Sequence, residues 1–503
     1  MEIYPRRGVY QGRAESVAWA RKSANPCAPS RASYRRSPLA AFGTSGLRGP
    51  ATDFTTGLCT AYVTAFLERC AANSSGRTAY VGADLRQSSP RIAGQCLAAI
   101  KAAGWTPVWA GNVPTPALAA YAMARSAPAV MITGSHIPES YNGIKFYRPD
   151  GEFLKEDEAP VRARAVEIEA EGRDAGIIAP GEPLAEVAES YVQRYVAAFG
   201  PDALAGFRIG VDLHSAVGRD LTMQILSGLG AECHGFRRVE TFIAVDTEAL
   251  DPADIARARL VIGEQKLDAV VSTDGDGDRP LVIDETGRQV NGDVLGVLTA
   301  KLIGARTVVT PLSSTSAVEQ SGWFETVERT RIGSPFVVAG MAAAATHPVA
   351  GFEANGGFLL GDDVALMRGM LGRLPTRDAI LPIVACLVLA KREGLTLSAL
   401  AATLPPRFMK ADRVKDVAAD KARIFLGEME MSESFRTAFD ARLARPVEIS
   451  VLDGVRMALA GGDTVHFRQS GNAPEMRVYV ETGSAEGTEA LLGAMMDKLA
   501  AAF

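Results

Sequence analysis

The sequence predicts an α/β protein with three similar domains, followed by a smaller α+β domain at the C-terminus. The order apolar strand, polar tip, helix, glycine and second strand recurs three times along the chain. It begins at TAYVGAD (78–84), at FRIGVDLHS (207–215) and at RTVVTPLSST (306–315). Each repeat is typical of a βαβ unit, which needs a right-handed crossover between parallel strands. Three such units indicate three α/β domains of one type.

Segments rich in proline and glycine divide the chain. IIAPGEPLAEV (177–187) separates the first unit from the second, and DETGRQVNGD (284–293) forms a turn before the third. LPPRFMKAD (404–412) cannot continue a helix through its two prolines. Beyond residue 445, short apolar runs alternate with glycine-rich turns and a helix ends the chain, as in an α+β domain. These signals predict an extension over 1–37 and four domains over 38–182, 183–288, 289–403 and 404–503.

Composition and charge exclude several classes of partner. A net charge of −5 disfavours general binding to nucleic acid or to an acidic membrane, although a local basic site for a small anion remains possible. The longest apolar run, 379–390, contains a proline and is too short to span a bilayer. The cysteines are scattered without a Cys-x-x-Cys pair, which indicates free thiols in a reducing cytosol: Cys27, Cys59, Cys70, Cys96, Cys233 and Cys386. We therefore expect a cytoplasmic protein without a nucleic-acid or membrane partner.

The first 37 residues are rich in arginine and lack the apolar core of a secretory signal. We interpret them as a loose extension or an over-long start. Targeting is the alternative.

The motif DGDGDR (274–279) predicts a metal site. LDAVVST before it and PLVIDE after it are typical of strands. Asp274, Asp276 and Asp278 alternate with other residues, and three such anions converge on one point only if a cation offsets their repulsion. Ligation by oxygen alone suits a hard cation, Mg²⁺ first.

Two alternatives to this Mg²⁺ site remain open. The three aspartates and Glu285 fall on the ligand positions of an EF-hand, but Arg279 stands at the central glycine, Pro280 follows, and the flanks are strands. The motif could also be a solvated acidic turn.

The stretch MITGSHIPESYNGIKFY (131–147) places Ser135 at the end of a strand, where α/β sheets hold their ligands. His136 and Lys145 are close to it in sequence. The alternative is a polar loop whose serine caps a helix. A Ser-His-Asp hydrolase is disfavoured because no G-x-S-x-G sequence surrounds the serine.

Two further loops carry anion-binding chemistry. FRQSGNAPEMRVYVE (467–481) supplies guanidinium forks, a hydroxyl and free backbone N–H groups, which together can cradle a phosphate dianion. An ordinary hairpin turn is the alternative for this segment. FGTSGLRG (42–49) is a glycine-rich loop with one arginine, Arg48, and is a weak signal alone.

Together these motifs resemble the α-D-phosphohexomutase family, and their wording is most similar to its bacterial phosphomannomutase branch. In that family a Thr-x-Ser-His loop holds the phosphorylated serine and matches 133–136, with a lysine ten residues on that matches Lys145. The family metal loop matches 274–279 without a change. The sugar loop corresponds to FEANGG (352–357), and the phosphate loop matches 468–477.

The resemblance covers about residues 38 to 503 and implies three α/β domains with mixed sheets and a smaller α+β domain around a central cleft. It implies interconversion of mannose 6-phosphate and mannose 1-phosphate through a phosphoserine enzyme and a hexose 1,6-bisphosphate, with glucose phosphates as further substrates. Phosphoglucomutase, phosphoglucosamine mutase and, less favoured, a Mg²⁺-dependent sugar phosphatase are the alternatives. The implied cofactors are one Mg²⁺ per chain and a hexose 1,6-bisphosphate activator. A hexose phosphate is the partner, and the protein would be a monomer or weak homodimer.

The resemblance also assigns roles to residues. The implied catalytic residues are Ser135, Lys145, His136, Arg48 and Arg279. The implied metal ligands are Ser135, Asp274, Asp276 and Asp278. The implied substrate-binding residues are Glu353, Asn355, Arg468, Ser470, Gly471, Asn472 and Arg477. Departures from the family pattern put the sugar preference in doubt: Ile137, Pro335, Asn355 and Gly357.

Overall fold

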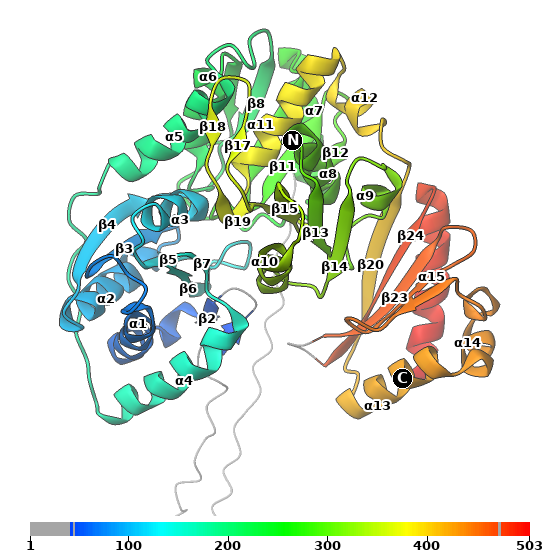
Figure 1. The fold of residues 1–503 in the computed structure, drawn as a ribbon, viewed down its shortest axis with the longest axis horizontal. Coiled ribbons are helices and arrows are strands. Elements are labelled where there is room, and N and C mark those ends of the chain that lie inside the picture. The colour runs from blue at the N-terminus through cyan, green and yellow to red at the C-terminus, as the bar shows by residue number, and fades with distance from the viewer. Residues whose placement is uncertain (1–40, 44–45, 471–473) are drawn as a thin grey trace, which may run out of the picture. The chain divides into compact units, whose positions relative to one another are not determined.

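The computed structural model describes residues 41–43, 46–470 and 474–503, whose strands form four large sheets and one two-stranded ribbon (Figure 1). The extension predicted over 1–37 lies outside these residues. Within the described ranges, no helix is long and apolar enough to cross a membrane. The cysteines in them are all free thiols, as their spacing predicts: Cys59, Cys70, Cys96, Cys233 and Cys386. Cys27 lies outside the described residues.

The first sheet mixes parallel and antiparallel pairs in the order β1–β2–β6–β5–β3–β4, with β7 paired to β6. Its strands are β1 (Ala41–Gly43), β2 (Gly46–Pro50), β3 (Thr78–Ala83), β4 (Thr106–Asn112), β5 (Ala129–Ile132), β6 (Tyr141–Arg148) and β7 (Gly151–Glu152). The helices of this region are η1 (Ala51–Asp53), α1 (Thr56–Cys70), α2 (Ser89–Ala102), α3 (Thr115–Met123) and α4 (Lys155–Ala170).

Helices cover both faces of this first sheet because its strands are apolar on both sides. Successive residues of a strand point to opposite faces. Val81, Val130 and Ile132 are buried in one cluster with residues of α1, α2 and α4. Tyr80 and Met131 are buried in another cluster with residues of α3 and α5 (Glu186–Phe199). The result is an α/β/α sandwich of the kind that the continuous apolar strands predict.

The second sheet has the order β12–β11–β10–β8–β9. Its strands are β8 (Arg208–Asp212), β9 (Glu232–Phe236), β10 (Ala269–Thr273), β11 (Pro280–Asp284) and β12 (Gln289–Val290), and its helices are α6 (Arg219–Gly228) and α7 (Pro252–Gln265). Val270 and Ile283 pack with α7, whereas Val271 and Val282 face the large cluster on the other side. Because β12 pairs with β11, this sheet extends past the predicted boundary at 288.

The third sheet has the order β14–β13–β15–β16–β19. Its strands are β13 (Thr307–Pro311), β14 (Thr326–Thr330), β15 (Val349–Phe352), β16 (Phe358–Leu360) and β19 (Leu374–Asp378), beside a ribbon of β17 (Val364–Ala365) and β18 (Met370–Leu371). The helices of this region are α8 (Gly292–Leu302), α9 (Ala317–Gln320), α10 (Ser334–Ala343), α11 (Ile380–Glu393) and α12 (Leu397–Ala401).

The three sheets share one connectivity, which confirms the prediction of three similar βαβ units. In each sheet a first strand (β3, β8 or β13) is parallel to the strand that follows its helix (β4, β9 or β14). The same first strand is parallel to a third strand (β5, β10 or β15) on its other side. That third strand then turns back into an antiparallel neighbour (β6, β11 or β16). All three sheets are therefore mixed.

The fourth sheet is antiparallel throughout, in the order β20–β24–β23–β22–β21. Its strands are β20 (Phe408–Lys415), β21 (Glu448–Ser450), β22 (Val455–Ala458), β23 (Thr464–Gln469) and β24 (Glu475–Thr482). Its helices are α13 (Ala419–Met431), α14 (Glu433–Phe439), η2 (Ala441–Leu443) and α15 (Ala485–Ala502). The α+β architecture predicted for the C-terminal region is confirmed.

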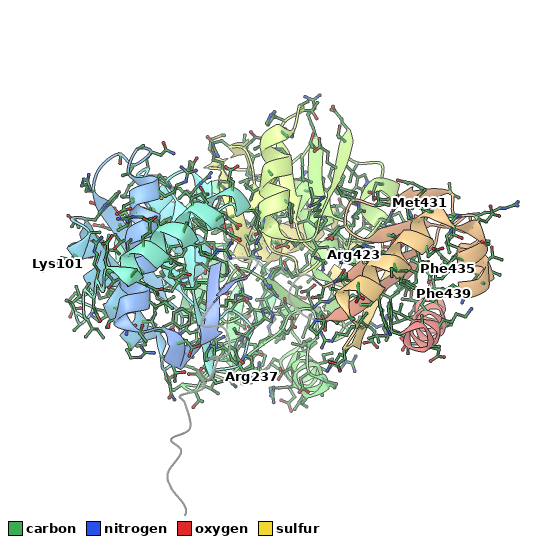
Figure 2. All side chains as sticks on the ribbon, turned by 90° about the horizontal axis from the view of Figure 1, so that it is seen from below. Lys101, Arg237, Arg423, Met431, Phe435 and Phe439 are labelled. Carbon is green, nitrogen blue, oxygen red and sulfur yellow. The ribbon has the colours of Figure 1, made fainter. Side chains whose placement is uncertain are left out.

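Aromatic rings pack at the centre of this last region. The ring of Phe425 on α13 lies 5.8 Å from that of Phe435 and 5.5 Å from that of Phe439, both of which Figure 2 labels. Phe467 of β23 lies 5.4 Å from Phe425 and joins the sheet to the helices. Edge-to-face contacts of this kind add to the stabilisation from burial. The strand that carries Arg468 is thereby anchored on its own core.

Candidate active site

Three of the predicted functional loops occupy the same position in the three mixed sheets. Each connects the third strand of its sheet to the antiparallel strand that follows. The Ser135 loop joins β5 to β6, the DGDGDR loop joins β10 to β11, and residues 353–357 join β15 to β16. The repeated fold therefore supplies one functional loop per sheet, at the strand ends where α/β proteins bind ligands.

The loop after β5 holds Ser135 in an unusual conformation. Ser135 has a φ of 54°, a left-handed conformation that is uncommon for a residue with a side chain. Its backbone N–H donates to Thr133 Oγ1 at 2.8 Å, and its Oγ donates to Asp274 Oδ2 at 2.6 Å. The alternative that this serine caps a helix is wrong, because strand β6 follows the loop. The serine of one sheet instead contacts the metal loop of the next.

The three aspartates of the DGDGDR loop converge, as predicted. Each offers one carboxylate oxygen, and these oxygens lie within 4.8 Å of one another. All three side chains are at most 1% exposed, which rules out a solvated acidic turn, and the flanking elements are the strands β10 and β11 rather than the helices of an EF-hand. Asp276 Oδ1 and Asp278 Oδ1 are buried without a hydrogen-bond partner in the described part of the chain. Buried oxygens of this kind fit a hard cation.

Lys145 brings a positive charge to the three aspartates. Its Nζ donates to Asp276 Oδ2 at 2.6 Å and to Asp278 Oδ2 at 2.7 Å, and its side chain is 3% exposed. The chain itself therefore supplies part of the positive charge that the sequence argument requires, because this ammonium group offsets part of the charge of the carboxylates. Thr115 Oγ1 also donates to Asp276 Oδ2, at 2.6 Å.

The charges at the site shift the pKa values of the three aspartates in opposite directions. Burial alone would raise the pKa of Asp278, but Arg377 and Lys145 outweigh it and hold that pKa well below its usual value. The pKa of Asp276 is also lowered, because Lys145 outweighs burial and the neighbouring Asp278. Burial and the two other carboxylates raise the pKa of Asp274. A cation bound beside Asp274 would favour its ionised form.

His136 lies beside the serine hydroxyl. Its Nδ1 is 3.4 Å from Ser135 Oγ. Burial, followed by the positive charge of Arg279, lowers the pKa of His136 to about 4. The imidazole is therefore neutral at pH 7, and a pKa this low makes it a weak base.

A cavity of about 350 Å³ opens in front of these buried groups. Eight of the predicted site residues line it: Arg48, His136, Arg279, Glu353, Asn355, Arg468, Ser470 and Arg477. Ser135, Lys145 and the three aspartates are buried and do not line it, whereas their sequence neighbours His136 and Arg279 do. Gly471 and Asn472 lie outside the described residues.

The lining is strongly basic. Burial and the nearby charges of Arg279 and Arg377 lower the pKa of Arg48, which marks a cluster of guanidinium groups. On the fourth sheet, Arg468 Nε donates to Asp453 Oδ2 at 2.8 Å, and Arg477 Nη2 donates to Glu475 Oε1 at 2.6 Å. β23 and β24 pair antiparallel, and Arg468 on β23 and Arg477 on β24 both line the cavity. A cavity of this charge suits a phosphorylated ligand.

Arg377 on β19 is a site residue that the sequence analysis missed. Its Nη2 lies 2.9 Å from Asp278 Oδ2 and its Nη1 lies 3.0 Å from Glu353 Oε2, so it connects the metal loop to the sugar loop. The guanidinium is 4% exposed. The sequence signal for Arg377 is weak, because this arginine lies between Thr376 and Asp378 at the end of a strand that carries no motif. Lys155 and Glu248 also line the cavity and were not predicted.

Comparisons with known proteins agree with this geometry. Models of the family "Phosphoglucomutase/phosphomannomutase" match as alpha/beta/alpha domain I over 39–171, domain II over 189–287 and domain III over 291–408. The phosphomannomutase of Sinorhizobium fredii is 41% identical over 461 residues, which cover 90% of this chain and 97% of the relative. The phosphoglucosamine mutase of Deinococcus radiodurans is 28% identical over 465 residues, which cover 89% and 94%.

The likeness extends to solved structures. The crystal structure of a putative phosphomannomutase from Thermus thermophilus matches with a TM-score of 0.70 at 24% identity, covering 92% of this chain and all of the other. At that identity the match bears on the fold alone. It supports the same arrangement of three mixed sheets and a C-terminal region.

Proposed function

Because the chain belongs to the phosphoglucomutase/phosphomannomutase family, we propose that it is a phosphomannomutase that interconverts mannose 6-phosphate and mannose 1-phosphate. One observation carries this proposal: Ser135 Oγ lies 2.6 Å from a carboxylate of the buried three-aspartate loop, and the adjacent His136 lines a basic cavity. A serine placed in this way can hold a phosphoryl group as an ester and pass it on. A protein that only binds sugar phosphates would not need this pair.

The proposed reaction runs through phosphorylated Ser135. The bond between phosphorus and Ser135 Oγ breaks, a bond to the free hydroxyl of the hexose monophosphate forms, and that hydroxyl loses its proton. The product is a hexose 1,6-bisphosphate. After the sugar turns end for end, its other phosphoryl group moves to Ser135 Oγ, and the isomeric monophosphate leaves.

Proton transfer in this scheme falls to His136 more readily than to Lys145. The neutral His136 imidazole has Nδ1 3.4 Å from Ser135 Oγ, whereas Lys145 Nζ donates its protons to two aspartates. We therefore assign Lys145 an electrostatic role, together with Arg279 and Arg48. These cations lie where negative charge develops as the phosphoryl group moves.

Asp274, Asp276 and Asp278 would hold one Mg²⁺, and the phosphorylated Ser135 is proposed as a further ligand. Two buried oxygens, Asp276 Oδ1 and Asp278 Oδ1, have no hydrogen-bond partner among the described residues and fit this ion. When bound, Mg²⁺ would neutralise charge on the phosphoryl oxygens during transfer. A hexose 1,6-bisphosphate would activate the enzyme by phosphorylating Ser135.

The distal phosphate of the substrate would bind to the fourth sheet. Arg468, Ser470 and Arg477 line the cavity there, and we also keep Gly471 and Asn472 in this proposed cradle. Because the sugar presents its two ends in turn, one distal site serves both half-reactions. Glu353 and Asn355 line the wall of the cavity and are proposed to contact the sugar hydroxyls.

Mannose phosphates are the preferred substrates in this proposal, and glucose phosphates are also used. The phosphomannomutase relative is 41% identical, compared with 28% for the phosphoglucosamine mutase. Mannose and glucose differ only at C2, so a site that contacts the hydroxyls at C3 and C4 accepts both. We further propose a monomer or weak homodimer that works in the cytoplasm.

The test is incubation of the purified protein with mannose 1-phosphate, Mg²⁺ and a trace of glucose 1,6-bisphosphate. Formation of mannose 6-phosphate supports the mutase. Release of inorganic phosphate would indicate a phosphatase, and no turnover would indicate a binding protein. Ser135→Ala is the matched control and must be inactive.

A further inference from the structure

Arg86 makes an unusual set of bonds to the loop that carries Ser135. It follows β3 in the sequence, and its side chain is fully buried. Nη2 donates to the carbonyls of Ser135 at 2.8 Å and Ile137 at 2.6 Å. Nη1 donates to the carbonyls of Pro138 at 2.8 Å and Tyr141 at 3.2 Å. One side chain therefore binds four carbonyls between residues 135 and 141.

The remaining guanidinium donor of Arg86, its Nε, pairs with the carboxylate of Asp84. Nε donates to Asp84 Oδ2 at 3.1 Å, and the backbone N–H of Arg86 donates to Asp84 Oδ1. Ser89 Oγ also donates to Asp84 Oδ1, at 2.6 Å. All five N–H groups of the guanidinium are thus used. Because the fork is planar and rigid, it fixes the direction of each carbonyl that it binds.

The Ser135 loop makes only short-range turn bonds of its own, such as those from Ile137 N–H to the Gly134 carbonyl and from Tyr141 N–H to the Pro138 carbonyl. It is neither helix nor strand from 133 to 140, and Ser135 adopts a positive φ. A strained conformation of this kind persists only when surrounding contacts determine it. Gly134 also lies against the guanidinium, since a Cβ at that position would be 2.7 Å from Arg86 Cζ.

Arg86 also connects this loop to the metal loop. The ring of Phe242, from the region of the second sheet, lies with its centre 3.9 Å from Arg86 Cζ. A Cβ at Gly275 would lie 2.8 Å from the Ser135 carbonyl oxygen and 2.9 Å from the Phe242 ring. Arg86, Phe242 and the DGDGDR loop therefore pack around the same peptide group, the one that follows Ser135.

We propose that Arg86 is the positioning residue that holds Ser135 in register with the three aspartates in both half-reactions, an inference that rests on the proposed function. Arg86 does not line the cavity and touches no reacting atom. It acts through the backbone carbonyl of Ser135, on the residue whose Oγ is 2.6 Å from Asp274. The Ser135 loop must hold its shape whether or not the serine carries a phosphoryl group, and the guanidinium supplies that shape.

Arg86→Lys tests the proposal, with Arg436→Lys as the matched control. Arg436 is also buried and also donates to backbone carbonyls, those of Met429 and Glu430, but it lies in the fourth domain away from Ser135. We expect Arg86→Lys to lower kcat by about 100-fold, the scale on which misplacing a reacting group by about 1 Å acts. KM for mannose 1-phosphate should change little, because the proposed phosphate and sugar contacts are untouched.

A second readout follows the uptake of a phosphoryl group by Ser135 from glucose 1,6-bisphosphate, measured by intact-protein mass spectrometry. Uptake should be slowed in Arg86→Lys and unchanged in Arg436→Lys. A kcat near the wild-type value, or a defect confined to KM, would overturn the proposal.

If Arg86→Lys does not fold, Gly134→Ala takes its place, because its methyl group displaces the guanidinium. An unchanged kcat in Gly134→Ala would overturn the proposal in the same way. A wild-type protein that takes up no phosphoryl group overturns the proposed function and this inference with it. Normal wild-type uptake with an unimpaired variant overturns this inference alone.

Discussion

Replacing Lys145 with methionine removes the ammonium group that lies between two of the three aspartates. Lys145 Nζ is 2.6 Å from Asp276 and 2.7 Å from Asp278, and none of these side chains is more than 3% exposed. Removing one partner of such a buried pair costs about 3–5 kcal/mol, because a buried charge is left without compensation. At about 1 °C per kcal/mol for a chain of this length, the unfolding temperature of the metal-free protein should fall by roughly 3–5 °C.

Saturating Mg²⁺ should recover most of that loss in Lys145→Met, because the cation supplies the missing positive charge next to the same carboxylates. Thermal unfolding followed by circular dichroism, in chelator and in Mg²⁺, measures both quantities. The matched control is Lys410→Met, which removes an ammonium group from an exposed pair with Glu489 and should change little in either condition. An equal loss with and without Mg²⁺, or none in chelator, would refute the reasoning.

Three further changes test other parts of the site and fold. Asp276→Asn should lower kcat by at least about 100-fold, since the charge stabilisation that a metal provides amounts to several kcal/mol; an enzyme that is insensitive to chelator would contradict the metal assignment. Glu353→Ala should lower kcat/KM for mannose 1-phosphate and glucose 1-phosphate alike, by the factor that corresponds to about 1–3 kcal/mol for substrate hydroxyls left unpaired. A fall in kcat/KM for one of the two sugars alone would show that Glu353 does not contact the hydroxyls they share. Burial lowers the pKa of His466 to about 4, so the folded state resists a proton that the unfolded state binds below about pH 6.5. The stability contributed by neutral His466 is therefore complete above pH 6.5 and falls toward pH 4, by about 3 kcal/mol in all. His466→Gln should flatten the dependence of the unfolding temperature on pH over this range, and an unchanged slope would argue against the assignment.

The repeated fold and the position of its loops could be predicted from the sequence because both depend on local patterns. Continuous apolar strands followed by polar tips identify Ser135 and the DGDGDR loop as strand-end features without any knowledge of contacts. The glycines of that loop also mark a tight turn, and Gly277 has a φ of 75°.

The partners of these residues could not be predicted, because they come from distant parts of the chain. Lys145 reaches aspartates more than one hundred residues away, and Arg377 joins Asp278 to Glu353 from a strand with no motif. Arg86 is similar: its role depends on four carbonyls whose directions the sequence does not specify. Sequence patterns indicate where a loop lies, whereas the charges around it depend on how the sheets pack.

The most direct test of the phosphoserine relay follows a labelled phosphoryl group from the enzyme. The protein is phosphorylated on Ser135 with ³²P from labelled glucose 1,6-bisphosphate, freed of the reagent, and mixed with unlabelled mannose 1-phosphate and Mg²⁺. We expect the label to leave the protein and appear in hexose bisphosphate and hexose monophosphate within the time of turnover. Label that stays on the protein, or that appears only as inorganic phosphate, would contradict the relay.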